Sequence, residues 1–138
     1  MISHVHVGVT DFERAFAFYS EVMDALGLPL KFCERGSQSG GQSKGSWAGW
    51  MPTDAARPLF LIGHPFDTAP ATAGNGQMVA LLAPDRAAVD ACHRRALAAG
   101  GHDDGPPGLR PHYHPNYYGA YFRDPDGNKI CVCCHDPA

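Results

Sequence analysis

The stretch that decides the fold is ISHVHVGVTDFERAFAFYSEVMDALG, residues 2–27. Its first part alternates valines with His4, His6 and a glycine, which predicts a strand with one aliphatic face. Thr10 and Glu13 then fit a capping box at the start of a helix. Apolar residues follow at helical spacing up to a glycine, where the helix is expected to end.

The same order of elements recurs in the second half. Residues 76–84, GQMVALLAP, predict another strand, and Asp85 is placed to cap another helix that ends at Gly100. Extended stretches follow each helix: 30–34, 46–51 and 58–63 in the first half, 117–122 and 129–134 in the second. The repeat predicts one α+β domain over residues 1–138. Its two βαβββ modules cover about 1–65 and 76–135, joined by a linker at 66–75. Residues 36–45, rich in Gly, Ser and Gln, predict a loop.

Composition narrows the class of protein. The chain has 138 residues, a formal charge of −3, 44% hydrophobic and 18% charged residues. A negative net charge does not indicate a basic surface for binding nucleic acid, and no apolar run is long enough to span a membrane. The N-terminus has no signal-peptide pattern, and five cysteines is an odd number. A cytoplasmic protein with free thiols is therefore expected.

Three stretches carry a family resemblance: HVHVGVTDFERAFAFYSEVMDALGL near the start, APDRAAVDACHRRALAAGG in the middle and YYGAYFRDPDGNKICVCCH at the end. They resemble the vicinal oxygen chelate superfamily of glyoxalase I, bleomycin and fosfomycin resistance proteins and extradiol dioxygenases, and one bacterial glyoxalase-like subfamily in particular. The resemblance implies a mixed sheet curled around a central cavity, with the helices outside. It also implies a homodimer that binds a small molecule in the inter-module cavity.

That architecture assigns faces to the strands. If the valines of the first strand pack on the helix, His4 and His6 face the cavity, because side chains alternate along a strand. By the same alternation Cys131 and Cys133 of the last strand face the cavity. A four-residue turn before that strand would pair Tyr118 with Cys133, which predicts Tyr118 in the cavity.

The resemblance also implies where a metal would bind. The four family positions fall on His4, Phe60, Met78 and Cys131, and only His4 is of the family's ligand type. A degenerate metal site and no cofactor are therefore predicted. The alternative is a lyase, isomerase or dioxygenase that holds Zn, Ni, Mn or Fe at His4.

The two cysteines of the last strand allow two further alternatives. His4, His6, Cys131 and Cys133 provide the two nitrogens and two sulfurs that zinc accepts. Alternatively, Cys131 acts as a nucleophile activated by His4, which makes these two the candidate catalytic residues of a thiol-dependent activity. The opposing interpretation is that Cys131 is a small buried thiol that fills space.

The segment 105–118, GPPGLRPHYHPNYY, predicts a stiff polar rim that suits the binding of a small anionic or aromatic molecule. Arg110 either binds a carboxylate or phosphate, or forms a salt bridge with Asp103 or Asp104. Trp47 either covers the pocket mouth or fills the core. The residues predicted to line the pocket are His4, His6, Trp47, Phe60, Met78, Arg110, Tyr113, His114, Tyr118, Cys131 and Cys133.

Overall fold

The computed structural model describes residues 1–36 and 45–138, so most of the loop predicted at 36–45 lies outside the described residues. The first module contains β1 (His4–Gly8), α1 (Phe12–Ala25), β2 (Leu30–Glu34), β3 (Trp47–Trp50) and β4 (Leu59–Gly63). The second contains β5 (Val79–Leu82), α2 (Arg86–Ala98), β6 (His102–Leu109), β7 (Tyr118–Arg123) and β8 (Lys129–Cys134). Each module is a four-stranded mixed sheet, ordered β1-β4-β3-β2 and β5-β8-β7-β6. The predicted α+β fold of two βαβββ modules is confirmed.

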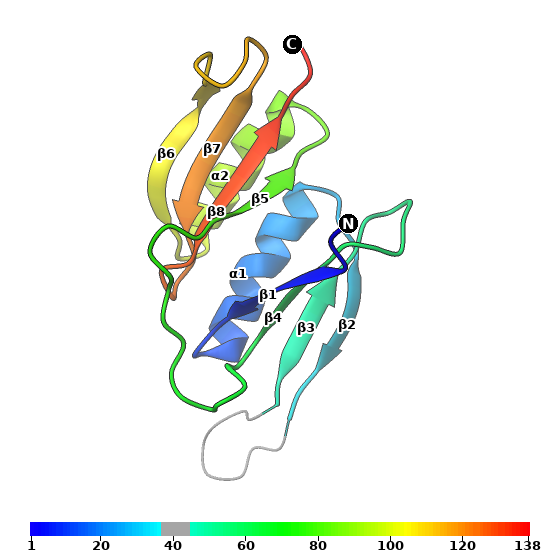
Figure 1. Cartoon of the computed structure of the whole chain (residues 1–138), viewed down its shortest axis with the longest axis vertical. Helices are drawn as coiled ribbons and strands as arrows, with labels where there is room; N and C mark the ends of the chain where they lie inside the picture. The colour runs from blue at the N-terminus through cyan, green and yellow to red at the C-terminus, as the bar shows by residue number, and fades with distance from the viewer. Residues whose placement is uncertain (37–44) are drawn as a thin grey trace.

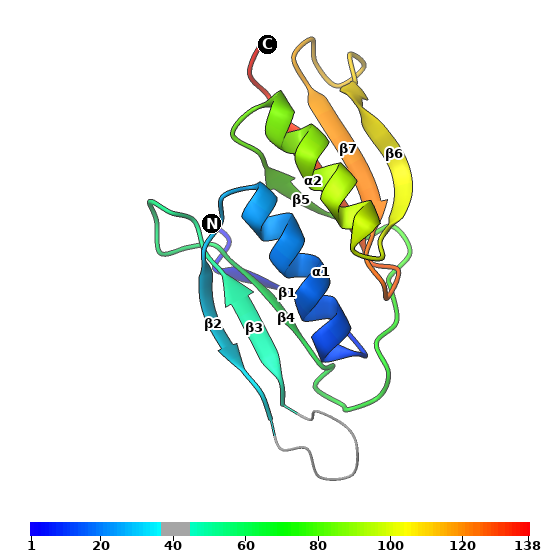
Figure 2. The same cartoon turned by 180° about the vertical axis from the view of Figure 1, so that it is seen from behind.

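Both helices lie on the same side of the two sheets. Figure 2 shows α1 and α2 next to each other in front of the strands, and Figure 1 shows the opposite, open faces of both sheets. One apolar core fills the space between helices and sheets, and both modules contribute to it. Within the described ranges, neither helix has the length and apolarity needed to cross a membrane.

The first helix begins one residue later than its sequence predicts. Asp11, not Thr10, is the N-cap, and its carboxylate accepts a hydrogen bond from the backbone N–H of Arg14. Thr10 instead contacts the linker, because its hydroxyl accepts a hydrogen bond from the backbone N–H of Ala71. Glu13 does not close a capping box but forms an ion pair with the guanidinium of Arg35. A short acidic side chain satisfies free helical N–H groups as well as threonine does.

Strand β6 has no counterpart among the predicted strands. It contains two prolines and two glycines, residues that disfavour a strand interior. It lies at the edge of its sheet and pairs with β7 through two irregular steps. An edge strand tolerates proline because one side needs no ladder hydrogen bonds.

The register of the last hairpin differs by one residue from the prediction. The turn closes with the N–H of Asp124 donating to the carbonyl of Asn128, 2.9 Å away. As a result Tyr118 pairs with Cys134 and Tyr121 pairs with Cys131. A shift of one residue moves every side chain to the other face. The prediction that Tyr118 faces the cavity was therefore wrong, since Tyr118 lies on the helix side and its hydroxyl donates to Asp90.

Candidate functional site

The open face of the first sheet carries two glycines where side chains of neighbouring strands cross it. A Cβ at Gly49 would lie 2.6 Å from both the Leu61 and the Phe32 side chains. A Cβ at Gly63 would lie 3.0 Å from Nε2 of His6 and 3.1 Å from Cβ of Trp47. Glycine at these positions therefore lets aromatic and imidazole rings lie close to the backbone of the sheet.

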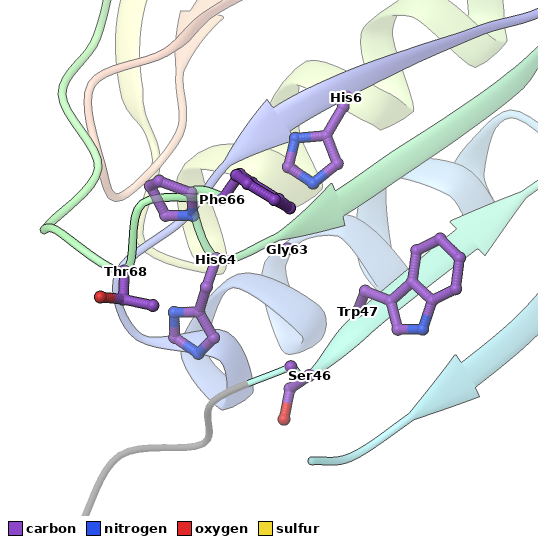
Figure 3. Close-up of a pocket in the computed structure, with 9 residues that line it drawn as sticks. His6, Ser46, Trp47, Gly63, His64, Phe66 and Thr68 are labelled. Atoms are coloured by element: carbon purple, nitrogen blue, oxygen red, sulfur yellow. The ribbon is translucent and has the colours of Figure 1, made fainter.

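A pocket of about 300 Å³ opens at this face (Figure 3). His6 of β1 and Trp47 of β3 stand on the sheet, whereas His64, Phe66 and Thr68 come from the chain that follows β4. The remaining lining residues are Gly45, Ser46, Gly63 and Pro65. The volume is at the lower end of the range for small-molecule sites.

Two aromatic rings give the pocket its apolar surface. The ring of Trp47 is 40% exposed, and its indole N–H donates to Glu34 over 3.0 Å, which fixes the ring plane. Phe32 packs against Trp47 with ring centroids 4.5 Å apart. Phe66 is fully exposed at the pocket mouth. A partly exposed, fixed indole offers a planar molecule a stacking surface.

Two imidazoles give the pocket its polar character. Partial burial, followed by the charge of neighbouring His4, keeps the pKa of His6 below its ordinary value. His6 is therefore neutral near pH 7. Nε2 of His64 is buried and has no hydrogen-bond partner among residues 1–36 and 45–138. A buried nitrogen without a partner is costly unless a ligand or water satisfies it.

A second cavity, of about 570 Å³, lies between the modules. Val5, Leu59 and Phe60 line it from the first module, and residues 78–82 line it from the second. Its surface is mainly apolar. Polar groups that would orient a small molecule are few here, in contrast to the pocket of Figure 3.

The second sheet has its own cluster on the open face. Cys131 and Cys133 of β8 are both buried, and they lie outside the core that the helices cover. The hydroxyl of Tyr117 lies 3.4 Å from Sγ of Cys131 and 3.3 Å from the hydroxyl of Tyr121. A hydrogen bond from Cys133, followed by those of the two tyrosines, lowers the pKa of Cys131 to about 7.

The structure distributes the predicted pocket residues over three places. His6 and Trp47 line the pocket of Figure 3, and Phe60 and Met78 line the inter-module cavity. Among the described residues, the linings of these two cavities do not include His4, Arg110, Tyr113, His114, Tyr118, Cys131 or Cys133.

Two predicted rim residues lie in the connection between β6 and β7 of the second module. Arg110 donates to the carbonyl of Pro106, and its guanidinium lies 5.5 Å from the centre of the Tyr121 ring. The predicted salt-bridge partners are used elsewhere, because Asp103 contacts His93 and Asp104 contacts Arg123. The ring of Tyr113 packs against that of Tyr117 in a tilted arrangement, with ring centroids 4.9 Å apart.

The four family metal positions do not converge. His4 pairs with Leu59 across the β1–β4 ladder, so Phe60 shares the face of Val5 and packs on Tyr19 of the first helix. The prediction that Phe60 shares a face with His4 was therefore wrong. Within the described part of the chain, no group of three or more His, Cys, Asp or Glu side chains is arranged to hold a metal ion. The set His4, His6, Cys131 and Cys133, considered above for zinc, therefore does not form such a group. This donor set does not fit the oxygen-rich shell that a hard divalent cation requires.

Sequence patterns did not identify His64, Phe66, Ser46 or Thr68 as pocket residues. The signal available was an imidazole directly after the apolar strand Leu59–Gly63, followed two residues later by an aromatic residue. Thr68 also has a positive φ of 64°, which is unusual for a β-branched residue and is not visible in sequence.

Comparison with known proteins places this geometry in a family. The model of the Glyoxalase/Bleomycin resistance protein/Dioxygenase superfamily matches residues 1–132. The chain belongs to this superfamily. A glyoxalase/bleomycin resistance protein from Albidiferax ferrireducens is 34% identical, covers 99% of both chains and superposes with a TM-score of 0.79. No curated protein matches the chain.

Two further members of the glyoxalase/bleomycin resistance/dioxygenase fold are informative. An antibiotic binding protein from a Streptomyces species is 27% identical over 99% of this chain and 96% of its own, with a TM-score of 0.62. A glyoxalase-related enzyme from Fulvimarina pelagi is 17% identical over 97% and 87%, with a TM-score of 0.69, and shows the shared fold alone. Solved structures that share this fold therefore include an antibiotic binding protein and a glyoxalase-related enzyme.

Proposed function

We propose that this superfamily member binds a small planar aromatic molecule carrying an anionic group, in the pocket of Figure 3 and without a metal ion. The observation that carries the proposal is the buried Nε2 of His64, which has no partner among the described residues, in the same pocket as the partly exposed indole of Trp47. The indole would stack on the ring, and an N–H of the His64 imidazole would donate a hydrogen bond to the anionic group. The antibiotic binding relative supports a binding role on this scaffold.

Replacement of Trp47 by alanine is expected to weaken the binding of naphthoate about 10-fold, or about 1.4 kcal/mol, because the stacking surface is lost. Calorimetric titration of naphthoate would measure this. Tyr113→Ala is the matched control, since Tyr113 is an exposed aromatic residue outside this pocket. Equal naphthoate affinity in the parent and the Trp47 variant, or an equal loss in the Tyr113 variant, would contradict the proposal.

The same titration tests the imidazoles through pH. Because the pKa of His6 is lowered, the His6 imidazole is neutral at pH 7.5 and gains positive charge as the pH falls toward 5.5. Naphthoate affinity is therefore expected to increase as the pH falls, and His6→Gln should reduce that increase. A flat pH profile in the parent protein would remove a charged His6 from the proposal.

The homodimer implied by the family resemblance remains a prediction, and the second sheet offers a surface for it. Leu82 is 68% exposed and Met78 is 45% exposed, both beside the apolar inter-module cavity. Contact with a second copy would cover them. Light scattering is expected to give a dimer that Leu82→Lys converts to monomer, whereas a monomeric parent protein would exclude it.

A further inference from the structure

The last residue of β4, Gly63, is a glycine that its backbone conformation does not require. It pairs with Gly8 of β1 on one side and with Trp47 of β3 on the other. Its φ is not positive, so a residue with a side chain could adopt the same conformation. Glycine weakens a strand because it has no side chain to pack, and it often marks a place where another group approaches the backbone closely.

The group that approaches Gly63 from β1 is the imidazole of His6. In the ladder His6 pairs with Leu61, two residues before Gly63. A Cβ at Gly63 would nevertheless lie only 3.0 Å from Nε2 of His6. The imidazole therefore leans from its own strand toward β4, as Figure 3 shows, and reaches the level of Gly63.

A second glycine on the same face gives the contrast. Gly8 pairs with Gly63 across the β1–β4 ladder, so side chains at the two positions would project from the same face. A Cβ at Gly8 would meet Ala71 at 3.6 Å and Pro65 at 3.7 Å, which are ordinary contacts. The open face therefore has room for a methyl group at Gly8, whereas at Gly63 the side chains of the pocket already fill that space.

Only one of the two close neighbours of Gly63 can give way. Cβ of Trp47, 3.1 Å from the position of a Cβ at Gly63, is attached to the backbone of β3, which is paired with β4. The imidazole of His6 is exposed and stands at the end of a rotatable side chain. A methyl group at Gly63 would therefore push the imidazole away from Trp47 and change the pocket that both residues line.

We infer that Gly63 is a positioning residue of the pocket of Figure 3: because it has no side chain, the His6 imidazole leans toward β4 and presents Nε2 to the bound anion. The inference rests on the proposed function, since it gives the anion a second polar contact beside the one from His64. Gly63 itself touches no ligand in this arrangement and acts through His6.

Calorimetric titration of naphthoate into four proteins tests the inference: the parent, Gly63→Ala, His6→Ala and the double variant. Gly63→Ala is expected to weaken binding about 10-fold, because the displaced imidazole loses its hydrogen bond to the anion. In the His6→Ala background the same substitution should change the affinity less than about 2-fold, since no imidazole remains to be displaced. Gly8→Ala is the matched control and should bind naphthoate as the parent does, because its Cβ makes ordinary contacts.

A measurement without naphthoate examines the position of the imidazole directly. In the parent protein, a nuclear Overhauser effect is expected between the ring protons of His6 and the Hα protons of Gly63. Its absence would overturn the inference, and this result decides the matter if Gly63→Ala fails to fold. Equal losses on Gly63→Ala with and without the His6 ring would overturn the inference alone. A parent protein that binds no naphthoate would overturn both the inference and the proposed function.

Discussion

Replacement of Asp124 by alanine is expected to lower the free energy of unfolding by about 3–4 kcal/mol, because hydrogen bonds to a buried charged group contribute about 1.5–3 kcal/mol each and are not additive. Asp124 is completely buried at the β7–β8 turn. Its carboxylate accepts from the Tyr19 hydroxyl at 2.5 Å, from the Nδ2 of Asn128 at 2.9 Å, and from the backbone N–H groups of Asp126 and Asn128, both at 2.9 Å. Removing it leaves several buried donors without an acceptor.

The same turn also joins the two modules. Tyr19 belongs to the first helix, and Nδ2 of Asn128 donates to the carbonyl of Gly8 in β1. The N–H of Thr10 donates to Asp126. Burial, together with the Asp124 carboxylate, raises the pKa of Tyr19 far above its ordinary value, so the phenol remains a hydrogen-bond donor throughout the physiological pH range. The Asp-Pro-Asp-Gly-Asn segment therefore forms hydrogen bonds between the two modules as well as within its own hairpin.

Urea unfolding would measure the effect of Asp124→Ala as a lower midpoint at unchanged slope. Asp136→Ala is the control, since this exposed aspartate should change stability by less than about 0.5 kcal/mol. Tyr19→Phe removes one donor and should cost about 1.5–3 kcal/mol. An Asp124 variant as stable as the control would show that the buried network does not stabilise the fold.

The sequence predicted the order of elements because hydrophobic periodicity follows secondary structure closely. The alternation in residues 4–9 and the helical spacing in residues 12–26 each reflect one buried face, and those faces are as predicted. The cavity-facing side of the last hairpin was not predictable in the same way. It depends on the register of the hairpin, that is, on whether Asp124 or Arg123 pairs with Asn128 at the turn. Asp124 does so, and its buried carboxylate is held by the hydroxyl of Tyr19 in α1, a contact that local sequence does not reveal.

The candidate pocket was predictable only on its strand side. His6 followed from alternation along β1, and Trp47 was one of two open interpretations. His64 and Phe66 lie in irregular chain, where no periodicity assigns a direction to a side chain. The face of Phe60 was predicted wrongly because it is set by the parallel pairing of β1 with β4. That pairing places Phe60 beside Val5, a residue 55 positions earlier in the chain, and local sequence does not determine it.

Replacement of Phe122 by alanine is expected to cost about 3–5 kcal/mol, the usual loss for a buried phenylalanine. Phe122 of β7 is completely buried, and its ring meets that of Phe18 in α1 edge-on, with centroids 5.9 Å apart. The contact crosses from the second module to the first. The cavity left behind therefore opens in the core that the two modules share.

Because the modules share one core, a destabilising substitution in the second module is expected to lower the stability of the first as well. Both tryptophans of the chain, Trp47 and Trp50, lie in β3, so their fluorescence originates in the first module. In Phe122→Ala, the unfolding midpoint from tryptophan fluorescence should fall together with that from circular dichroism. Phe122→Leu, which preserves most of the volume, should cost less than about 1.5 kcal/mol. A fluorescence midpoint that stayed at the parent value while the dichroism midpoint fell would mean that the modules unfold independently, and that the Phe18–Phe122 contact does not couple them.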